Sequence, residues 1–152
     1  MSKYNNSKVY LVEYEGLCKR FWKQAPALAF CNEHSINPAD ILVFDSNKEC
    51  NRWEELKAME QRDEISDLQR QVVYTLVPAQ YMEKLVVVRN KEKLKKYRAE
   101  APITYKADFT YYQDGKLVVE DVKSEMTRHL PDYVMKRKLM LYVHGIKLKE
   151  VI

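Results

Sequence analysis

Hydrophobic and polar positions alternate in short runs at several places along the chain and recur at helical spacing at others. The loose alternation of KVYLVEYEG, residues 8–16, predicts a first strand. Residues 25–38, APALAFCNEHSINP, have a proline near each end and fit a short helix. Apolar positions in residues 45–64 recur at helical spacing and predict a longer helix, which Ser46 can cap.

The next runs predict strands. Residues 71–78, QVVYTLVP, indicate a strand that ends at its proline. Residues 84–98 join a short apolar run to a strongly basic stretch. In residues 107–124, two apolar runs flank Asp114-Gly115, a dipeptide typical of two-residue hairpin turns.

After this hairpin, Thr127 and Pro131 indicate the start of a second helix, which runs to about Tyr142 and is stopped by Gly145. Residues 146–152 predict a closing strand.

From Ser46 onward the expected order is helix, strand, two-stranded hairpin, helix, strand. This order predicts a mixed α/β domain in which helices flank a small sheet. A chain of 152 residues is long enough for one ordinary domain with its own core. We therefore expect a single domain, in which residues 1–45 form an extension and residues 46–152 form the core.

The hairpin carries its acids far from the turn. If Gln113 pairs with Lys116, Asp108 falls directly opposite Asp121, with Cβ atoms about 4.5–5.5 Å apart. Lys123 then points to the same face as Asp121, because side chains alternate along a strand. By the same alternation, the neighbouring Glu120 points to the other face, opposite Phe109.

Two opposed carboxylates repel each other, so an ordinary hairpin gains nothing from Asp108 and Asp121. A divalent cation between them reverses the sign of the interaction, and Mg²⁺ prefers such oxygen ligands. Lys123 beside them could stabilise an anionic transition state or orient a water molecule. The alternative is a solvated strand end where Lys123 neutralises Asp121, and the pattern alone does not decide between the two.

The hairpin ADF…YYQDGKLVVEDVKS, with DSNKE before it and YVMKRKL after it, resembles the PD-(D/E)XK nuclease superfamily. It is most similar to small phage and prophage endonucleases related to phage Holliday-junction resolvases. The resemblance covers about residue 44 to the C-terminus and implies a restriction-endonuclease-like core, αβββαβ. Ala107 replaces the proline of the motif, and Ser124 stands where a glycine often follows the lysine.

The resemblance implies a metal-dependent DNA endonuclease, whose substrate by analogy is branched DNA. Asp108 and Asp121 would hold Mg²⁺, which Mn²⁺ is expected to replace, and Lys123 would be the catalytic lysine. Glu49 would act on the metal directly or through water, although Ser46-x-x-Glu49 is also a capping box. Gln71 is a candidate accessory residue, and a plain polar strand edge is the alternative for it.

The net charge of +4, from 26 basic and 22 acidic residues, proves little by itself, but the basic residues are clustered. Such runs are usually solvated surfaces. Beside a nuclease site they would neutralise DNA phosphates with little sequence readout. The candidate DNA-binding residues are Lys93, Lys95, Lys96, Arg128, Lys136 and Lys138.

Other features limit the alternatives. The sequence has no apolar run long enough to cross a membrane, and residues 1–10 are too polar for a signal peptide, so we expect a cytoplasmic protein. Cys18, Cys31 and Cys50 fit neither a zinc motif nor a disulfide framework. A homodimer is expected, because resolvases cut two strands symmetrically. The alternative function is a non-catalytic DNA-binding accessory protein of phage replication or recombination.

Overall fold

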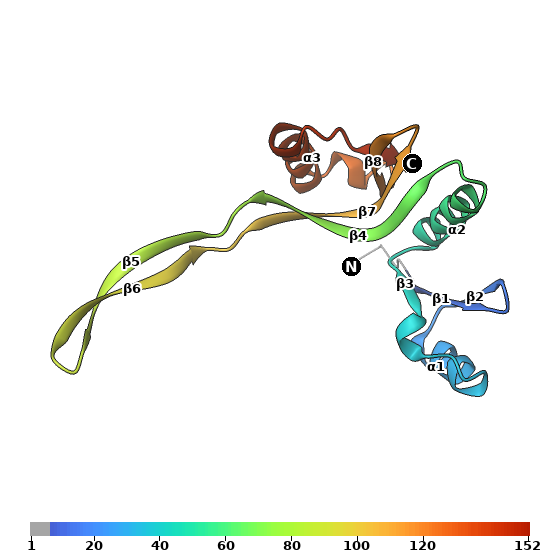
Figure 1. Cartoon of the computed structure of the whole chain (residues 1–152), viewed down its shortest axis with the longest axis horizontal. Coiled ribbons are helices and arrows are strands. Elements are labelled where there is room, and N and C mark those ends of the chain that lie inside the picture. The colour runs from blue at the N-terminus through green and yellow to red at the C-terminus, as the bar shows by residue number, and fades with distance from the viewer. Residues whose placement is uncertain (1–6) are drawn as a thin grey trace. The chain divides into compact units, whose positions relative to one another are not determined.

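The structure is a computed structural model, and it describes residues 7–152 (Figure 1). Helices and several sheets are both present, which confirms the expected mixed α/β class. The polar N-terminal stretch from which we expected no signal peptide lies largely in residues 1–6, outside the described residues. Across residues 7–152, no helix combines the length and apolar character needed to cross a membrane.

The chain divides into two compact units, of which the first ends at Ile65 and the second comprises Ser66–Ile152. The division therefore lies beyond the boundary at 45/46 that we expected between extension and core. The helix that we assigned to the start of the core belongs to the first unit. Each unit is described by itself.

The first unit contains a small antiparallel sheet in the order β2-β1-β3. The predicted strand and short helix are confirmed as β1 and α1, whereas β2 and β3 were not predicted. Ala27 and Cys31 of α1 bury their side chains with Val12 of β1. The elements are β1 Val9–Tyr14, β2 Leu17–Phe21, α1 Gln24–Glu33, β3 Leu42–Phe44 and α2 Asn47–Gln61, with a short 3₁₀ turn at Pro38–Asp40.

The α2 helix confirms the predicted long helix and its cap. The Ser46 hydroxyl accepts a hydrogen bond from the Glu49 amide at 3.1 Å, which satisfies one of the free N–H groups of the first turn. Buried Trp53 and Leu56 lie one turn apart, as the helical spacing predicted.

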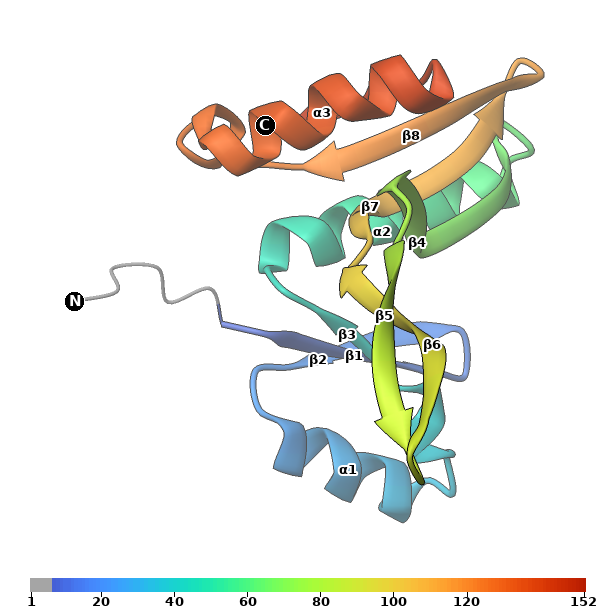
Figure 2. The same cartoon turned by 90° about the vertical axis from the view of Figure 1, so that its left-hand side faces the viewer.

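The second unit is built on a four-stranded sheet in the order β4-β7-β8-β9. Neighbouring strands are antiparallel except β8 and β9, which are parallel and are connected by α3. The α3 helix lies alongside β8 (Figure 2). The core of the second unit contains Leu76, Tyr105, Ala107, Val119, Tyr133, Met140 and Leu148. The elements are β4 Ser66–Val77, β7 Ile103–Gln113, β8 Lys116–Val122, α3 Pro131–His144 and β9 Lys149–Val151, with a 3₁₀ turn at Thr127–His129.

A two-stranded ribbon, β5 Gln80–Val88 with β6 Lys91–Glu100, lies between β4 and β7 in the chain. It continues these two strands outward from the four-stranded sheet (Figure 1). We expected an apolar run and a basic stretch here, not a hairpin. Arg89 and Asn90 form its two-residue turn, with φ of 51° and 59°, as a type I′ turn requires.

The register predicted for the second hairpin is confirmed. Asp114 and Gly115 form its turn with φ of 51° and 73°. Gln113 pairs with Lys116, and the ladder runs without slippage to the pair of Phe109 and Glu120. The predicted order of helix, strand, hairpin, helix and strand is thus present along the chain, with the ribbon inserted after the first of these strands.

Candidate functional site

Asp121 and Lys123 form an ion pair at the end of β8. The Asp121 carboxylate is buried, with 1% of its side chain exposed, and its Oδ2 lies 2.8 Å from the Lys123 Nζ. The contact confirms that both residues share a face, as the alternation predicted. Lys123 pairs with Asp121, as the structural alternative expected, but Asp121 is shielded from water, which a solvated strand end would not be.

Asp108 lies in β7, in the register position that follows the pair of Phe109 and Glu120. The ladder has ended at this point, and the Asp108 Oδ2 accepts a hydrogen bond from the Val122 amide at 2.8 Å. This bond holds the half-buried Asp108 side chain against the strand segment between Asp121 and Lys123. The structure thus brings together three of the four residues predicted for the catalytic site.

The negative charge of Asp121 contributes to the raised pKa values of two tyrosines. Burial raises the pKa of Tyr105, and the negative charge of Asp121 raises it further. The pKa of Tyr133, on α3, is raised by burial first and by Asp121 second. Both hydroxyls therefore stay protonated at neutral pH beside a poorly solvated carboxylate. Neither tyrosine was among the predicted site residues, because strand tyrosines such as Tyr105 are usually packing residues.

Glu120, the neighbour of Asp121, has a different environment. Its fully buried Oε2 accepts a hydrogen bond from the Tyr111 hydroxyl at 2.8 Å and lies 3.4 Å from the Lys149 Nζ. Lys149 also donates to the Tyr111 hydroxyl at 3.1 Å. Glu120 is thus held in a local hydrogen-bonded group, which is how a structural buried acid is usually satisfied.

A pocket of about 540 Å³ lies next to the ion pair and is lined by Lys123 and Lys136. Lys106, Tyr105 and Tyr133 line it as well, and Asp132 is its acidic residue. Three lysines in one pocket favour an anionic ligand such as a phosphate group. Lys136 was predicted to bind DNA, whereas Lys106 was missed because only the register of β7 brings it near the hairpin's end.

Gln71 lies in β4 between the residues that pair with Phe109 and Ala107, which places it at the register position of Asp108. Its φ of +55° is left-handed, which is strained for a residue with a side chain. Such strain persists where surrounding structure enforces it and is common near functional sites. The candidate accessory residue is therefore beside the site in the same sheet.

Glu49 belongs to the first unit. Its side chain is buried, and its Oε2 accepts a hydrogen bond from the Asp45 amide at 3.2 Å, while its own amide donates to Ser46. These contacts are typical of a capping interaction at the start of α2. They support the structural alternative for Glu49, and its metal-binding role stays a prediction.

The remaining DNA-binding candidates differ in their surroundings. Lys138 and Arg128 line a second pocket of the unit, of about 380 Å³. The Arg128 guanidinium lies 3.0 Å from Glu150 and 3.5 Å from Glu125, so acidic partners already engage it. Lys93 and Lys95 are exposed on the β5–β6 ribbon, and Lys96, also exposed, pairs across it with Glu83.

Asp108 and Asp121 fit the donor set that Mg²⁺ uses. Mg²⁺ is usually bound through one or two carboxylates, and waters and substrate phosphates complete its shell. The carboxylate oxygens of Asp121, which is buried, are ligands of the kind that a hard cation prefers. In residues 7–152, no group of three or more His, Cys, Asp or Glu side chains is arranged to hold a metal. Asp108 and Asp121 would supply two carboxylates to such a site.

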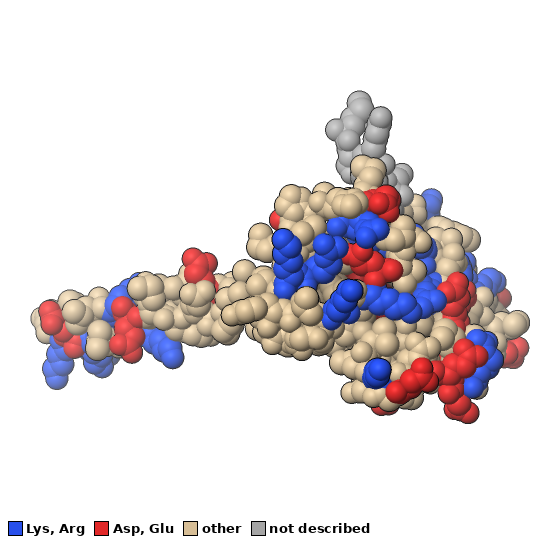
Figure 3. All heavy atoms as spheres, turned by 90° about the horizontal axis from the view of Figure 1, so that it is seen from above, with Lys and Arg blue, Asp and Glu red and all other residues tan. Residues whose placement is uncertain are grey.

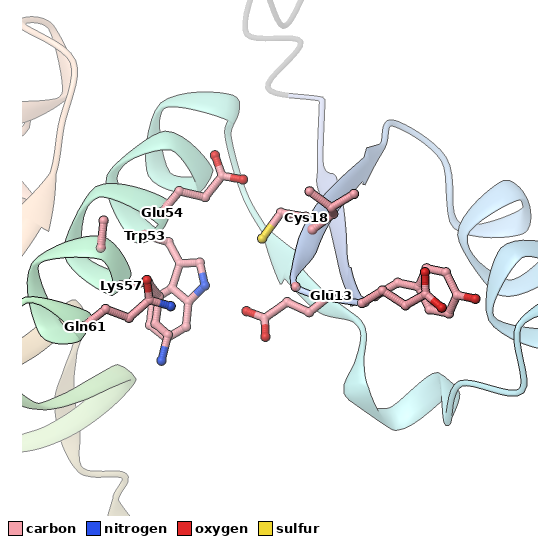
Figure 4. Close-up of a pocket in the computed structure, with 11 residues that line it drawn as sticks. Glu13, Cys18, Trp53, Glu54, Lys57 and Gln61 are labelled. Carbon is pink, nitrogen blue, oxygen red and sulfur yellow. The ribbon is translucent and has the colours of Figure 1, made fainter.

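The first unit has a pocket of about 460 Å³ with different chemistry (Figure 4). Glu13, Glu54 and Cys18 line it, together with Trp53 and Lys57 of α2. Burial and the charge of Glu13 raise the pKa of the Cys18 thiol, which makes the thiol less reactive at neutral pH. Its carboxylates would repel a phosphate backbone, so this pocket is not a candidate for nucleic-acid binding.

Together, the fold and the site define a mixed α/β protein whose second unit carries a buried Asp–Lys pair beside a lysine-lined pocket. The chain belongs to the DUF1064 family, described as a protein of unknown function, whose family model matches residues 35–151. That match includes parts of both units. No curated protein and no solved structure matches the chain.

Proposed function

We propose that this protein is a metal-dependent endonuclease that hydrolyses DNA phosphodiester bonds. The observation that carries the proposal is the Asp121 carboxylate, which is buried and paired with Lys123 beside a lysine-lined pocket. Burying a carboxylate in this way is costly, and a purely structural acid is normally hydrogen-bonded, as Glu120 is. The resemblance of the hairpin to PD-(D/E)XK nucleases supplies the reaction class.

The second unit provides a role for each group. Asp108 and Asp121 would hold Mg²⁺ or Mn²⁺, and the pocket lysines, Lys106 and Lys136, would bind the phosphate that enters beside Lys123. Bound Mg²⁺ would polarise a phosphate oxygen and lower the pKa of a bound water. Lys123 would stabilise negative charge on the phosphate or orient the attacking water.

The order of elements supports the same proposal. In the second unit, β4, the β7–β8 hairpin, α3 and β9 follow the order of the PD-(D/E)XK core after its first helix. The helix that would carry the remaining acid is α2, with Glu49 near its start. Glu49 would act on the metal directly or through water. Glu49→Gln should therefore lower the cleavage rate under conditions in which the variant is folded.

Branched DNA is the proposed substrate, and a homodimer the proposed active form. Both parts rest on the resemblance to phage Holliday-junction resolvases, which cut two strands symmetrically. Size-exclusion chromatography with light scattering, with and without a four-way junction, tests the dimer. A monomer that cuts one strand at a time would exclude it.

The proposed reaction is tested with purified full-length protein on linear, nicked and four-way-junction DNA. Cleavage should require Mg²⁺ or Mn²⁺ and disappear in excess chelator. Lys123→Met should be inactive with either metal, whereas Lys147→Met, which removes the same charge outside the Asp121 site, should retain activity. Robust cleavage in excess EDTA would contradict the metal mechanism.

The second candidate function is a non-catalytic DNA-binding accessory protein. Two observations favour it: the capping contacts of Glu49, and the finding that residues 7–152 hold no cluster of three possible metal-binding side chains. On this hypothesis the protein binds DNA in the presence of Mg²⁺ and never cuts it. Binding without cleavage on all three substrates, with either metal, would decide for this function.

A further inference from the structure

The β5–β6 ribbon has two faces with different charge. Residues that pair directly across an antiparallel ladder share a face, and successive pairs alternate between faces. The register is regular from the pair of Tyr81 and Arg98 to the pair of Val88 and Lys91. It therefore assigns every side chain of this stretch to one face or the other.

One face carries four lysines and no acid. Its cross-strand pairs are Met82–Tyr97, Lys84–Lys95, Val86–Lys93 and Val88–Lys91. Two contacts confirm that Met82, Lys84 and Tyr97 lie together on this face: the Lys84 Nζ is 5.3 Å from the Tyr97 ring centroid, and the Tyr97 hydroxyl is 3.9 Å from the Met82 sulfur. This surface is called the lysine face below.

The other face is balanced in charge. Its pairs are Tyr81–Arg98, Glu83–Lys96, Leu85–Leu94 and Val87–Glu92, with two basic and two acidic residues. The Lys96 Nζ lies 5.0 Å from the Tyr81 ring centroid, which confirms that Lys96 belongs here. The register therefore separates Lys96 from Lys93 and Lys95, with which the sequence grouped it.

The lysine face is unfavourable for an isolated ribbon. Lys84 and Lys95 are directly opposed, and like charges in this position repel. Both strands are mostly exposed along their length, and a lone two-stranded ribbon has little stability of its own in water. An anionic partner would relieve this repulsion. Figure 3 shows basic and acidic side chains along the projecting ribbon.

We propose that the β5–β6 ribbon is a DNA-binding arm that lays its lysine face against the phosphates of duplex DNA. A two-stranded ribbon fits the major groove of B-form DNA, whereas the major groove of duplex RNA is too narrow for it. The lysine face supplies Lys84, Lys91, Lys93 and Lys95, and the charge-balanced face points away from the backbone. This inference deepens the proposed function by naming the surface that recognises the substrate.

The test compares two variants that each remove two positive charges from β6. Lys93→Ala/Lys95→Ala removes charge from the lysine face, and Lys96→Ala/Arg98→Ala removes it from the other. Binding of the full-length protein to duplex DNA is measured by fluorescence anisotropy in EDTA, so that no cleavage occurs. Circular dichroism spectra show whether both variants are folded.

Each lost phosphate contact reduces the slope of log affinity against log salt by about 0.9 on duplex DNA. Lys93→Ala/Lys95→Ala should therefore flatten the slope by about 1.8, so that raising salt fourfold weakens the wild type about 12-fold more than the variant. Lys96→Ala/Arg98→Ala should leave the slope close to that of the wild type. With duplex RNA of the same length, the difference between the two variants should be small.

Equal effects of the two variants would overturn the proposal, because net charge alone would then explain binding. An unchanged slope in Lys93→Ala/Lys95→Ala would overturn it as well, and a larger effect on duplex RNA than on DNA would exclude the major groove. These outcomes are independent of cleavage. A protein that binds as proposed and cuts nothing would contradict the endonuclease and leave the arm intact.

Discussion

Asp121 and Glu120 are adjacent in sequence and both buried, yet they should have opposite mutational effects. Asp121→Asn should abolish DNA cleavage and change stability little. Glu120→Gln should lower stability and retain cleavage at temperatures where the protein is folded. The two substitutions remove one negative charge each and keep the size of the side chain, so each serves as the control for the other.

The small effect of Asp121→Asn on stability follows from opposing contributions. At 2.8 Å and an effective dielectric constant of about 20, the attraction between Asp121 and Lys123 is about 6 kcal/mol. Taking charges out of water costs several kcal/mol per ion, which offsets most of this attraction. Because the Lys123 side chain is 24% exposed, it can reach water once the carboxylate is gone. The free energy of unfolding should therefore change by no more than about 1 kcal/mol, or about 4 °C in melting temperature.

Glu120→Gln loses more, because Glu120 is well satisfied. The Gln carbonyl can still accept from Tyr111, but the ion pair with Lys149 is lost. At 3.4 Å this pair contributes about 5 kcal/mol before solvent screening. Because Lys149 is 48% exposed, most of this is discounted, which leaves an expected loss of about 1–3 kcal/mol. The melting temperature should fall by about 3–10 °C.

Thermal unfolding with and without Mg²⁺ separates the two acids further. At a Mg²⁺ concentration about 100 times the dissociation constant, binding stabilises a folded protein by about 2.7 kcal/mol. The wild type and Glu120→Gln should both show this upward shift, whereas Asp121→Asn should show little of it. A folded but inactive Glu120→Gln beside an active Asp121→Asn would refute the assignment of the site.

Three further substitutions test other parts of the second unit. Glu150 accepts hydrogen bonds from Arg137 and Tyr133, which hold its pKa below the usual 4.5 although burial opposes them. The stabilising contribution of Glu150 is fully present above the unfolded-state pKa of about 4.5 and is lost as pH falls through the lowered pKa of the folded state. The free energy of unfolding of Glu150→Gln, measured in urea, should therefore depend less on pH below about 4.5 than that of the wild type. Gly145→Ala should cost about 1–2 kcal/mol in urea unfolding, because a left-handed φ of 67° is unfavourable for alanine although the space for its Cβ is open. Gln71→Gly should keep or raise the melting temperature by relieving its left-handed strain, and should lower cleavage if the side chain serves the site; full activity would make Gln71 a plain strand residue.

The parts of the fold that the sequence predicted are those set by local chemistry. Asp114-Gly115 requires a tight turn, and this turn fixes the register that pairs Phe109 with Glu120. Ser46 starts α2 and Gly145 ends α3, because both satisfy helix ends through short-range bonds or a left-handed backbone. These features need no knowledge of distant residues.

The parts that were missed depend on packing or on weak turn signals. Arg89-Asn90 turns the ribbon, but an arginine in a left-handed conformation is an unusual turn residue, and the surrounding lysines resemble a solvated surface. The boundary after Ile65 was not predicted, because nothing in the sequence of α2 indicates to which unit the helix belongs. Alternation along β8 predicted the contact of Asp121 with Lys123 and not its burial, which depends on the packing of the surrounding unit.

The site and the ribbon share one physical feature: each concentrates charged side chains that a bound partner of opposite charge would stabilise further. Asp121 is buried beside Lys123, and on the proposed function a metal ion would add to the attraction that Lys123 supplies. Lys84 and Lys95 oppose each other across the ribbon and need an anion. On the proposed function, a metal ion bound together with DNA would supply both, because the metal would contact the carboxylates while the phosphates would contact the lysines. The stability of the folded protein should therefore rise more with Mg²⁺ and DNA together than with either alone, since each partner removes a different unfavourable interaction.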